Sequence, residues 1–188
     1  MGARTVPAAA RILGDQVGSL APMFLAFLAA HVIAGLTAVI AGALAAVARK
    51  GSPWHIRAGR WFYRAITVVF LTATALSIIR WRQDYHLLAI GVVAFAGATI
   101  GYLHRRRHRP GDTGHILGMG ISYVAMLTAF YVDNGPHLPL WDRLPTLSFW
   151  FLPGVIGAPI IARALLAARH RTSHADPGSE RPRTAPRR

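Results

Sequence analysis

The sequence predicts an all-α protein, an integral membrane bundle of five transmembrane helices. Five apolar stretches run through the 188 residues, and the loops between them alternate between arginine-rich and arginine-poor. Each stretch is close to or above the roughly 20 residues that a helix needs to cross a hydrocarbon core. Backbone amides in lipid must pair within the protein, which leaves helices or closed barrels. Continuous runs rich in Ala, Leu, Ile and Gly favour helices over the alternating strands of a barrel.

The five stretches carry very few charges. The first holds no Asp, Glu, Lys or Arg, whereas Arg64 lies near the start of the second and Arg163 near the end of the fifth. Long arginine side chains at such positions can extend to the interface. Pro153 and Pro159 predict a kink in the fifth helix. The stretches cover residues 21–48, 61–79, 85–104, 115–132 and 147–168.

These stretches divide the chain into three parts. We expect residues 1–20 to be a short extracytoplasmic segment and residues 21–168 to be the five-helix transmembrane domain. Residues 169–188 are rich in Pro, Arg, Ser and Thr and predict a disordered, basic cytoplasmic tail. The first stretch is too long for the core of a signal peptide, so we expect an uncleaved anchor. The sequence alone indicates no internal repeat.

Positive charge predicts how the chain is threaded. Of the 21 Lys and Arg residues, 16 lie on the side of the loops that follow the first, third and fifth stretches, when Arg64 and Arg163 at the ends of their stretches are included, and five lie on the opposite side. Cytoplasmic loops carry the excess of Lys and Arg. We therefore expect a multi-pass protein of the bacterial cytoplasmic (inner) membrane, with its N-terminus outside and its C-terminus in the cytoplasm.

The net charge of +14 and the lack of cysteine limit the possible functions. The arginines lie at helix ends and in the tail, where membrane topology accounts for them, so we expect no nucleic-acid partner. The expected partner is the lipid bilayer, including anionic lipid at the cytoplasmic face. A chain without cysteine has no disulfide, iron–sulfur cluster, thiolate-ligated haem or thiol nucleophile.

Small residues mark the helix faces that are expected to pack. His31, Gly35, Ala38 and Gly42 form one stripe on the first helix. Glycines in such a stripe let another backbone come close. A second stripe, on the fourth helix, comprises His115, Gly118, Ser122, Ala125 and Ala129, with Tyr123 beside it.

Histidines are the main candidates for chemistry. A residue as deep as His31 usually faces the bundle interior. It is expected to hydrogen-bond a neighbouring helix, to ligate a metal or haem, or to take part in a proton path. His55 and His115 lie near the inner surface in different segments and can meet. The ligand or cofactor candidates are His31, His55, His86, His115, Ser122, Tyr123 and Asp133.

Several groups of residues together resemble a known family. They are residues 31–35; Lys50, Gly51, His55, Arg57, Gly59 and Arg60; His115, Met119, Ser122 and Tyr123; and residues 130–136 with 138–141. In this combination, over about residues 24–168, the chain resembles the bacterial membrane proteins catalogued as domain of unknown function 2306. The chain departs from the family pattern at Ile56, where Arg is expected. The resemblance implies topology and no particular chemistry.

Two kinds of function remain open. We favour a non-enzymatic bundle for transport, lipid contact or partner binding, because the sequence has no nucleophile motif, phosphate loop or paired carboxylates. The alternative is a haem- or metal-binding redox protein that uses intramembrane histidines. Haem b needs two axial ligands from facing helices. The candidate pairs are His31 with His86 and His55 with His115. A metal site built from His31, Asp133 and His137 is the other form of this alternative.

Overall fold

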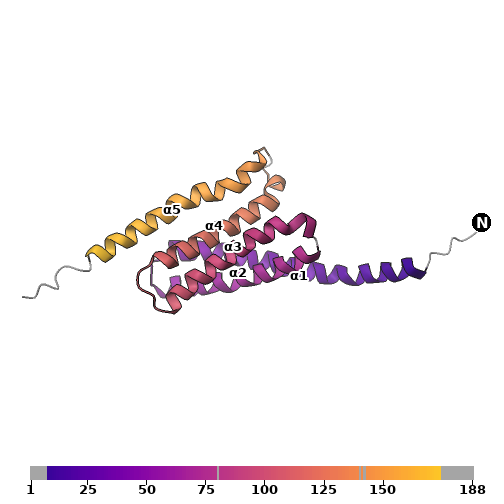
Figure 1. The fold of residues 1–188 in the computed structure, drawn as a ribbon, viewed down its shortest axis with the longest axis horizontal. Coiled ribbons are helices and arrows are strands. Elements are labelled where there is room, and N and C mark those ends of the chain that lie inside the picture. The colour runs from indigo at the N-terminus through magenta and orange to yellow at the C-terminus, as the bar shows by residue number, and fades with distance from the viewer. Residues whose placement is uncertain (1–7, 80, 140, 142, 175–188) are drawn as a thin grey trace, which may run out of the picture.

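The computed structural model describes residues 8–79, 81–139, 141 and 143–174, and Figure 1 shows their arrangement. Within these residues all regular structure is helical, as predicted, and five helices are long and apolar enough to cross a membrane. The chain is therefore an all-α membrane protein. Its elements are α1 (Ala8–Val47), α2 (Pro53–Ile79), α3 (Trp81–Arg106), α4 (Thr113–Asn134), the 3₁₀ helix η1 (Gly135–His137) and α5 (Thr146–His174).

All five helices begin before their apolar stretches, α1 and α2 by the largest margins. α1 has 40 residues and begins at Ala8, so most of the segment predicted at residues 1–20 is helical. At 1.5 Å per residue this helix measures about 60 Å, twice the thickness of a hydrocarbon core, and its N-terminal part extends beyond the other helices in Figure 1. α2 begins at Pro53, because proline suits the first helical position and the Ser52 hydroxyl accepts a hydrogen bond from the His55 amide at 3.2 Å.

The last helix is longer than predicted. α5 runs without interruption from Thr146 to His174 through Pro153 and Pro159. The prediction that the disordered tail begins at residue 169 is therefore wrong for residues 169–174, which continue the helix. Residues 175–188, where the rest of that tail was predicted, lie outside the described residues.

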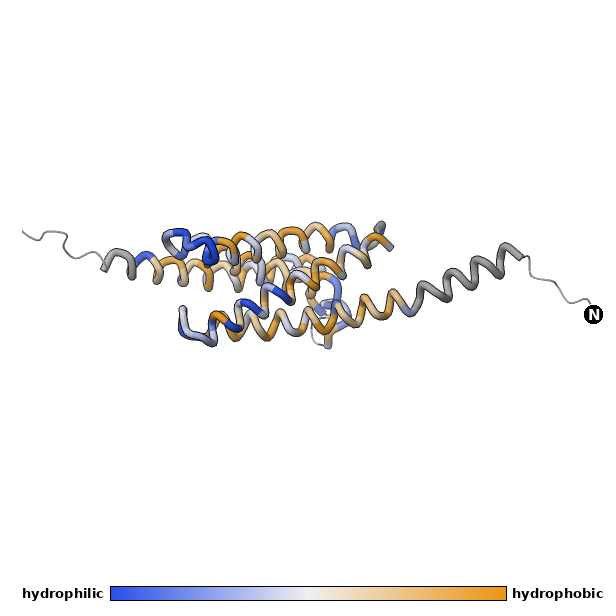
Figure 2. Tube along the Cα trace, turned by 90° about the horizontal axis from the view of Figure 1, so that it is seen from below, coloured by the Kyte–Doolittle hydropathy of each residue, from blue (hydrophilic) through white to orange (hydrophobic). Residues whose placement is uncertain are grey.

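The first four helices form two antiparallel hairpins. The first hairpin is α1 with α2, the second is α3 with α4, and α2 packs against α3 between them. α5 packs against α4 at the side of this bundle (Figure 1). Hydrophilic residues gather near the loops, and the middles of the helices are hydrophobic (Figure 2). The core residues are Ala38, Ala41, Phe62, Ala65, Ile66, Ala94, Ala98 and Met126.

The second hairpin is held together by close backbone contact. A Cβ atom added at Gly118 of α4 would lie 2.6 Å from both the Gly101 amide nitrogen and the Gly97 carbonyl oxygen of α3. Real Cβ atoms do not come so close to backbone atoms. The predicted role of Gly118 in a packing face is therefore confirmed, and small residues let the two helices touch.

Candidate functional site

His55 lies at the start of α2 and is fixed to the helix before it. Its Nδ1 atom lies 2.9 Å from the carbonyl oxygen of Ala45, in the last turns of α1. A carbonyl oxygen only accepts hydrogen bonds, so Nδ1 carries the ring proton, and Nε2 of the neutral ring is left as an acceptor. The side chain is half-buried. This bond fixes both the tautomer and the direction of the ring.

His115 has the same arrangement at the start of α4. Its Nδ1 atom lies 3.0 Å from the carbonyl oxygen of Gly101, near the end of α3. Its Nε2 atom is therefore also an acceptor in the neutral ring. The ring is again half-buried. Each histidine thus binds the first helix of its own hairpin.

The two histidines meet across the hairpins, as the sequence suggested. Their ring centroids lie 6.0 Å apart, with the ring planes at 76°. Within the described residues, neither Nε2 atom makes a hydrogen bond. The pair lies between the loops at residues 48–52 and 107–112, at what we call the basic end of the bundle. Two imidazole acceptors in one place can bind a cation or a hydrogen-bond donor.

The second helices of the two hairpins begin alike, and the absence of an internal repeat stays a prediction. The N-cap carbonyls of Ser52 and Asp112 accept the amide protons of Ile56 and Ile116 at 3.1 and 2.9 Å. Each cap precedes its histidine by three positions. On α2 and α4, identical residues recur 60 positions apart: His55 and His115, Ile56 and Ile116, Tyr63 and Tyr123, Phe70 and Phe130. On α1 and α3 they recur 56 positions apart: Gly35 and Gly91, Ala38 and Ala94.

His31 faces a neighbouring helix, as predicted. Its Nδ1 atom lies 2.9 Å from the hydroxyl oxygen of Thr72 on α2. That hydroxyl donates to the carbonyl oxygen of Val68 at 2.8 Å, so it accepts the His31 proton. Of the roles predicted for His31, this bond supports the structural one. Asp133 is exposed and makes no ion pair with His31.

The structure gives no support to the first predicted haem pair. His86 lies at the opposite end of α3, where its ring contacts Tyr85 and, at a centroid distance of 6.0 Å, Trp150 of α5. No ring contact joins it to His31 in the described part of the chain. His31 and His86 therefore do not form a facing pair.

The second predicted haem pair does meet, and on its inner side the bundle is filled by side chains and close backbone contact. Two turns along from the histidines, Phe62 is 1% exposed and packs against the Tyr123 ring at 6.0 Å. Beside His115, the close approach of Gly101 and Gly118 fills the space between α3 and α4. This packing gives no support to haem b on the inner side of the pair. Nor do three His, Asp or Glu side chains gather to hold a metal anywhere in the described residues, so the site of His31, Asp133 and His137 is not formed.

Ser122 and Tyr123 serve the packing of α4. The Tyr123 hydroxyl donates to the carbonyl oxygen of Val39 at 3.1 Å and joins α4 to α1. Ser122 is fully buried, and its hydroxyl oxygen makes no hydrogen bond. An unmade bond of this kind costs about 1–3 kcal/mol, which the close contact of α3 with α4 must offset.

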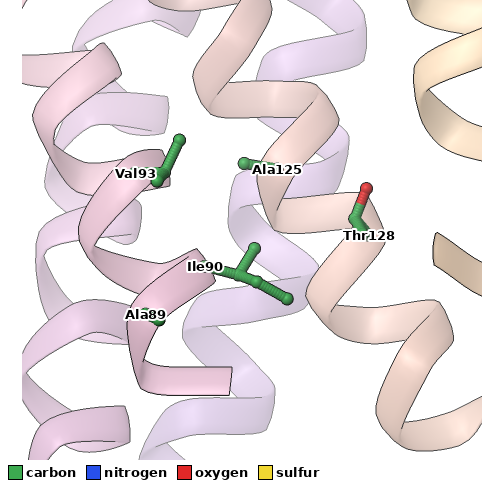
Figure 3. A pocket seen from close by; sticks show the side chains of 5 residues that line it. All are labelled: Ala89, Ile90, Val93, Ala125 and Thr128. Carbon is green, nitrogen blue, oxygen red and sulfur yellow. The ribbon is translucent and has the colours of Figure 1, made fainter. Parts of the chain in front are cut away.

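A hollow of about 340 Å³ opens between α3 and α4 (Figure 3). Its lining consists of aliphatic side chains and one hydroxyl, that of Thr128, which already donates to the carbonyl oxygen of Val124. No charged group lines it, so it suits a hydrocarbon chain and offers no chemistry. The lining residues are Ala89, Ile90, Val93, Ala125 and Thr128.

The sequence reasoning missed a surface feature at the start of α2. Trp54, Arg57, Trp61 and Arg64 follow one another at spacings of three, four and three, so they share one face of the helix, and all four are exposed. The Arg57 guanidinium lies 5.6 Å from the Trp54 ring centre, and that of Arg64 lies 5.7 Å from the Trp61 ring centre. We call these four residues the tryptophan–arginine ladder. The spacing alone could have revealed it.

Comparison with known proteins found no matching family model, no matching curated protein and no matching solved structure. The resemblance to domain of unknown function 2306 therefore stays a prediction.

Proposed function

We propose that the protein is a non-enzymatic bundle of the bacterial inner membrane that binds anionic lipid headgroups at its cytoplasmic face. The tryptophan–arginine ladder carries this proposal. It places two guanidinium groups, each resting on an indole ring, on the exposed side of α2 at the basic end. Such a surface has the chemistry that a phosphodiester headgroup requires.

Each component of the ladder suits the membrane interface. Tryptophan concentrates at the level of the headgroups. A guanidinium presents five donors in a planar fork that matches phosphate, and stacking on an aromatic face leaves this fork available. Within the described residues, neither Arg57 nor Arg64 pairs with a carboxylate, whereas Arg105 pairs with Asp112 at 2.7 Å. A lipid phosphate is therefore the natural counter-ion of the ladder.

Orientation supports the same assignment. The basic end carries the larger share of the cations, so it faces the cytoplasm by the positive-inside rule. Anionic lipid in the cytoplasmic leaflet attracts such residues, at about 1 kcal/mol for each cation near the surface. We include membership of the family catalogued as domain of unknown function 2306 in this proposal, because the resemblance implies the same membrane topology for this chain.

Lipid contact is better supported than the other two non-enzymatic roles, transport and partner binding. The hollow between α3 and α4 has no charged group that would bind a polar substrate. The ladder, by contrast, combines aromatic and cationic groups in one defined geometry. Lipid contact is thus the role for which the described residues provide specific chemistry.

The test compares thermal unfolding in nanodiscs of phosphatidylcholine with and without phosphatidylglycerol. The wild type should gain stability from the anionic lipid, and the double variant Arg57→Gln/Arg64→Gln should lose about 2 kcal/mol of that gain. The matched control, Arg82→Gln/Arg143→Gln, removes the same charge from exposed positions at the other end and should keep the gain. A ladder variant that gains as much stability as the wild type would overturn the proposal.

A further inference from the structure

Beyond lipid binding, and independently of it, we propose that His55 and His115 bind one cuprous ion at the basic end of the bundle. The Nε2 atoms of the two rings would supply two ligands, and the thioether of Met119 a third. The juxtaposition of two imidazoles from different hairpins, each held by its other nitrogen, is the observation behind this inference.

Both rings have the orientation that metal-binding histidines usually have. A ligating histidine typically donates its second ring N–H to a carboxylate or a backbone carbonyl, which fixes the tautomer and directs the lone pair. His55 donates to the Ala45 carbonyl oxygen at 2.9 Å, and His115 donates to that of Gly101 at 3.0 Å. Both Nε2 atoms are then neutral acceptors, so an ion can bind without displacing a proton.

The separation of the rings suits one shared ion. An imidazole nitrogen binds a metal ion at about 2.0–2.1 Å and lies roughly 1.1 Å from its ring centre, so two rings on one ion have centroids at most about 6.3 Å apart. The centroids of His55 and His115 are 6.0 Å apart. Both rings are half-buried rather than enclosed, so an ion can reach them from the loop side.

The pair lies where the two hairpins meet. His55 and His115 occupy the same place in their hairpins, three positions after the N-cap, and each binds the helix before it. Histidines from the two hairpins thus meet at one interface.

The donor set selects the ion. Zinc requires four ligands and calcium or magnesium six or more oxygens, but no third His, Asp or Glu joins the pair in the described residues. Imidazole together with thioether favours copper in its soft, reduced state. Met119 lies one turn after His115, and both residues contact Gly101: a Cβ added there would lie 3.1 Å from the Met119 sulfur.

Charged groups of both signs lie near the pair. The Arg105 guanidinium and the Asp112 carboxylate both lie near His115, and they pair with each other at 2.7 Å. The Lys50 ammonium donates at 3.3 Å to the Ala45 carbonyl oxygen that also accepts from His55, so a monovalent ion suits the pair better than an ion of higher charge. The core packs against Met119, which keeps the thioether partly out of water.

The experiment measures binding of Cu(I) to the full chain, purified without a histidine tag, by anaerobic competition with bathocuproine disulfonate. The wild type should bind one equivalent. His55→Asn and His115→Asn retain an amide where Nδ1 stood but lose Nε2, and each should weaken binding at least 100-fold. Met119→Leu should weaken it about tenfold. His86→Asn, at the opposite end of α3, is the matched control and should bind like the wild type.

A second measurement does not depend on any variant. X-ray absorption of the copper-loaded wild type should show imidazole scattering from two rings. A spectrum without imidazole, a wild type that takes no copper from the competitor, or folded asparagine variants with wild-type affinity would each overturn the proposal. Retained affinity would indicate that copper binds elsewhere on the chain.

Discussion

His55 and His115 lie side by side with ring centroids 6.0 Å apart, although 60 positions of sequence separate them. Each ring is bound to the helix that precedes it, so the contact joins one complete hairpin to the other. This relationship makes the basic end of the bundle an assembled structure rather than two independent loops. It also leads to predictions that do not depend on any ligand.

The first prediction concerns this contact. His55→Ala and His115→Ala should destabilise the protein non-additively, with a coupling free energy of about 0.5 kcal/mol or more, because the two rings interact directly. Reversible unfolding in detergent measures each term of the cycle. The control cycle pairs His55→Ala with His86→Ala, at the opposite end, and should be additive. Additive losses in the first cycle would argue against contact in solution.

The second prediction concerns the contact between α3 and α4. Gly118→Ala should cost about 1–3 kcal/mol of unfolding free energy, because the new methyl group would overlap backbone atoms of Gly97 and Gly101 that cannot rotate away. Gly59→Ala, on α2, has no heavy atom within 4 Å of the added Cβ and should be neutral or stabilising. Equal effects at the two positions would contradict the close packing.

Tyr123 provides the third prediction. Tyr123→Phe removes the hydroxyl that donates to Val39, so it should cost about 0.5–1.5 kcal/mol and loosen α4 from α1. Tyr63→Phe is the control at the equivalent position of the other hairpin. Its ring stacks on that of Tyr102 at 4.3 Å, and this stacking survives the substitution. If both variants unfold at the same denaturant concentration, the bond to α1 contributes nothing.

The fourth prediction tests the structural role of His31. His31→Leu and Thr72→Val should each weaken the association of α1 with α2, and the coupling between them should be about 0.6 kcal/mol, the average for hydrogen bonds between membrane helices. His31→Asn can replace the donor at Nδ1 and should retain most of the stability. A stable His31→Leu variant that loses a cellular phenotype would instead show that His31 has a functional role.

Much of the fold could be predicted from the sequence, for physical reasons. Lipid requires long apolar helices, so the five spans are visible in composition alone. The inward direction of His31 and the contact of His55 with His115 also followed from depth and position. The ends of the helices were harder to predict from the sequence. Ser52 and Pro53 start α2 well before its apolar run, because capping and proline geometry act independently of hydrophobicity.

The rest required the structure. The likeness between the starts of α2 and α4 rests on a few identical residues separated by dissimilar ones, and it becomes clear only when the hydrogen bonds of His55 and His115 are compared. The pair His31 and His86 looked equally suitable as ligands, but the positions of Thr72 and Trp150 give each ring a different partner. Tertiary packing decides such alternatives, and helical spacing alone does not.

The central claim is that the basic end, with the tryptophan–arginine ladder, lies at the cytoplasmic face. The chain has no cysteine, so single cysteines can be labelled without background. Arg109→Cys probes the loop at the basic end, and Arg143→Cys probes the exposed loop at the other end. In intact cells a membrane-impermeant maleimide should label Arg143→Cys and should reach Arg109→Cys only after permeabilisation. Labelling of Arg109→Cys in intact cells, with protection of Arg143→Cys, would contradict the account.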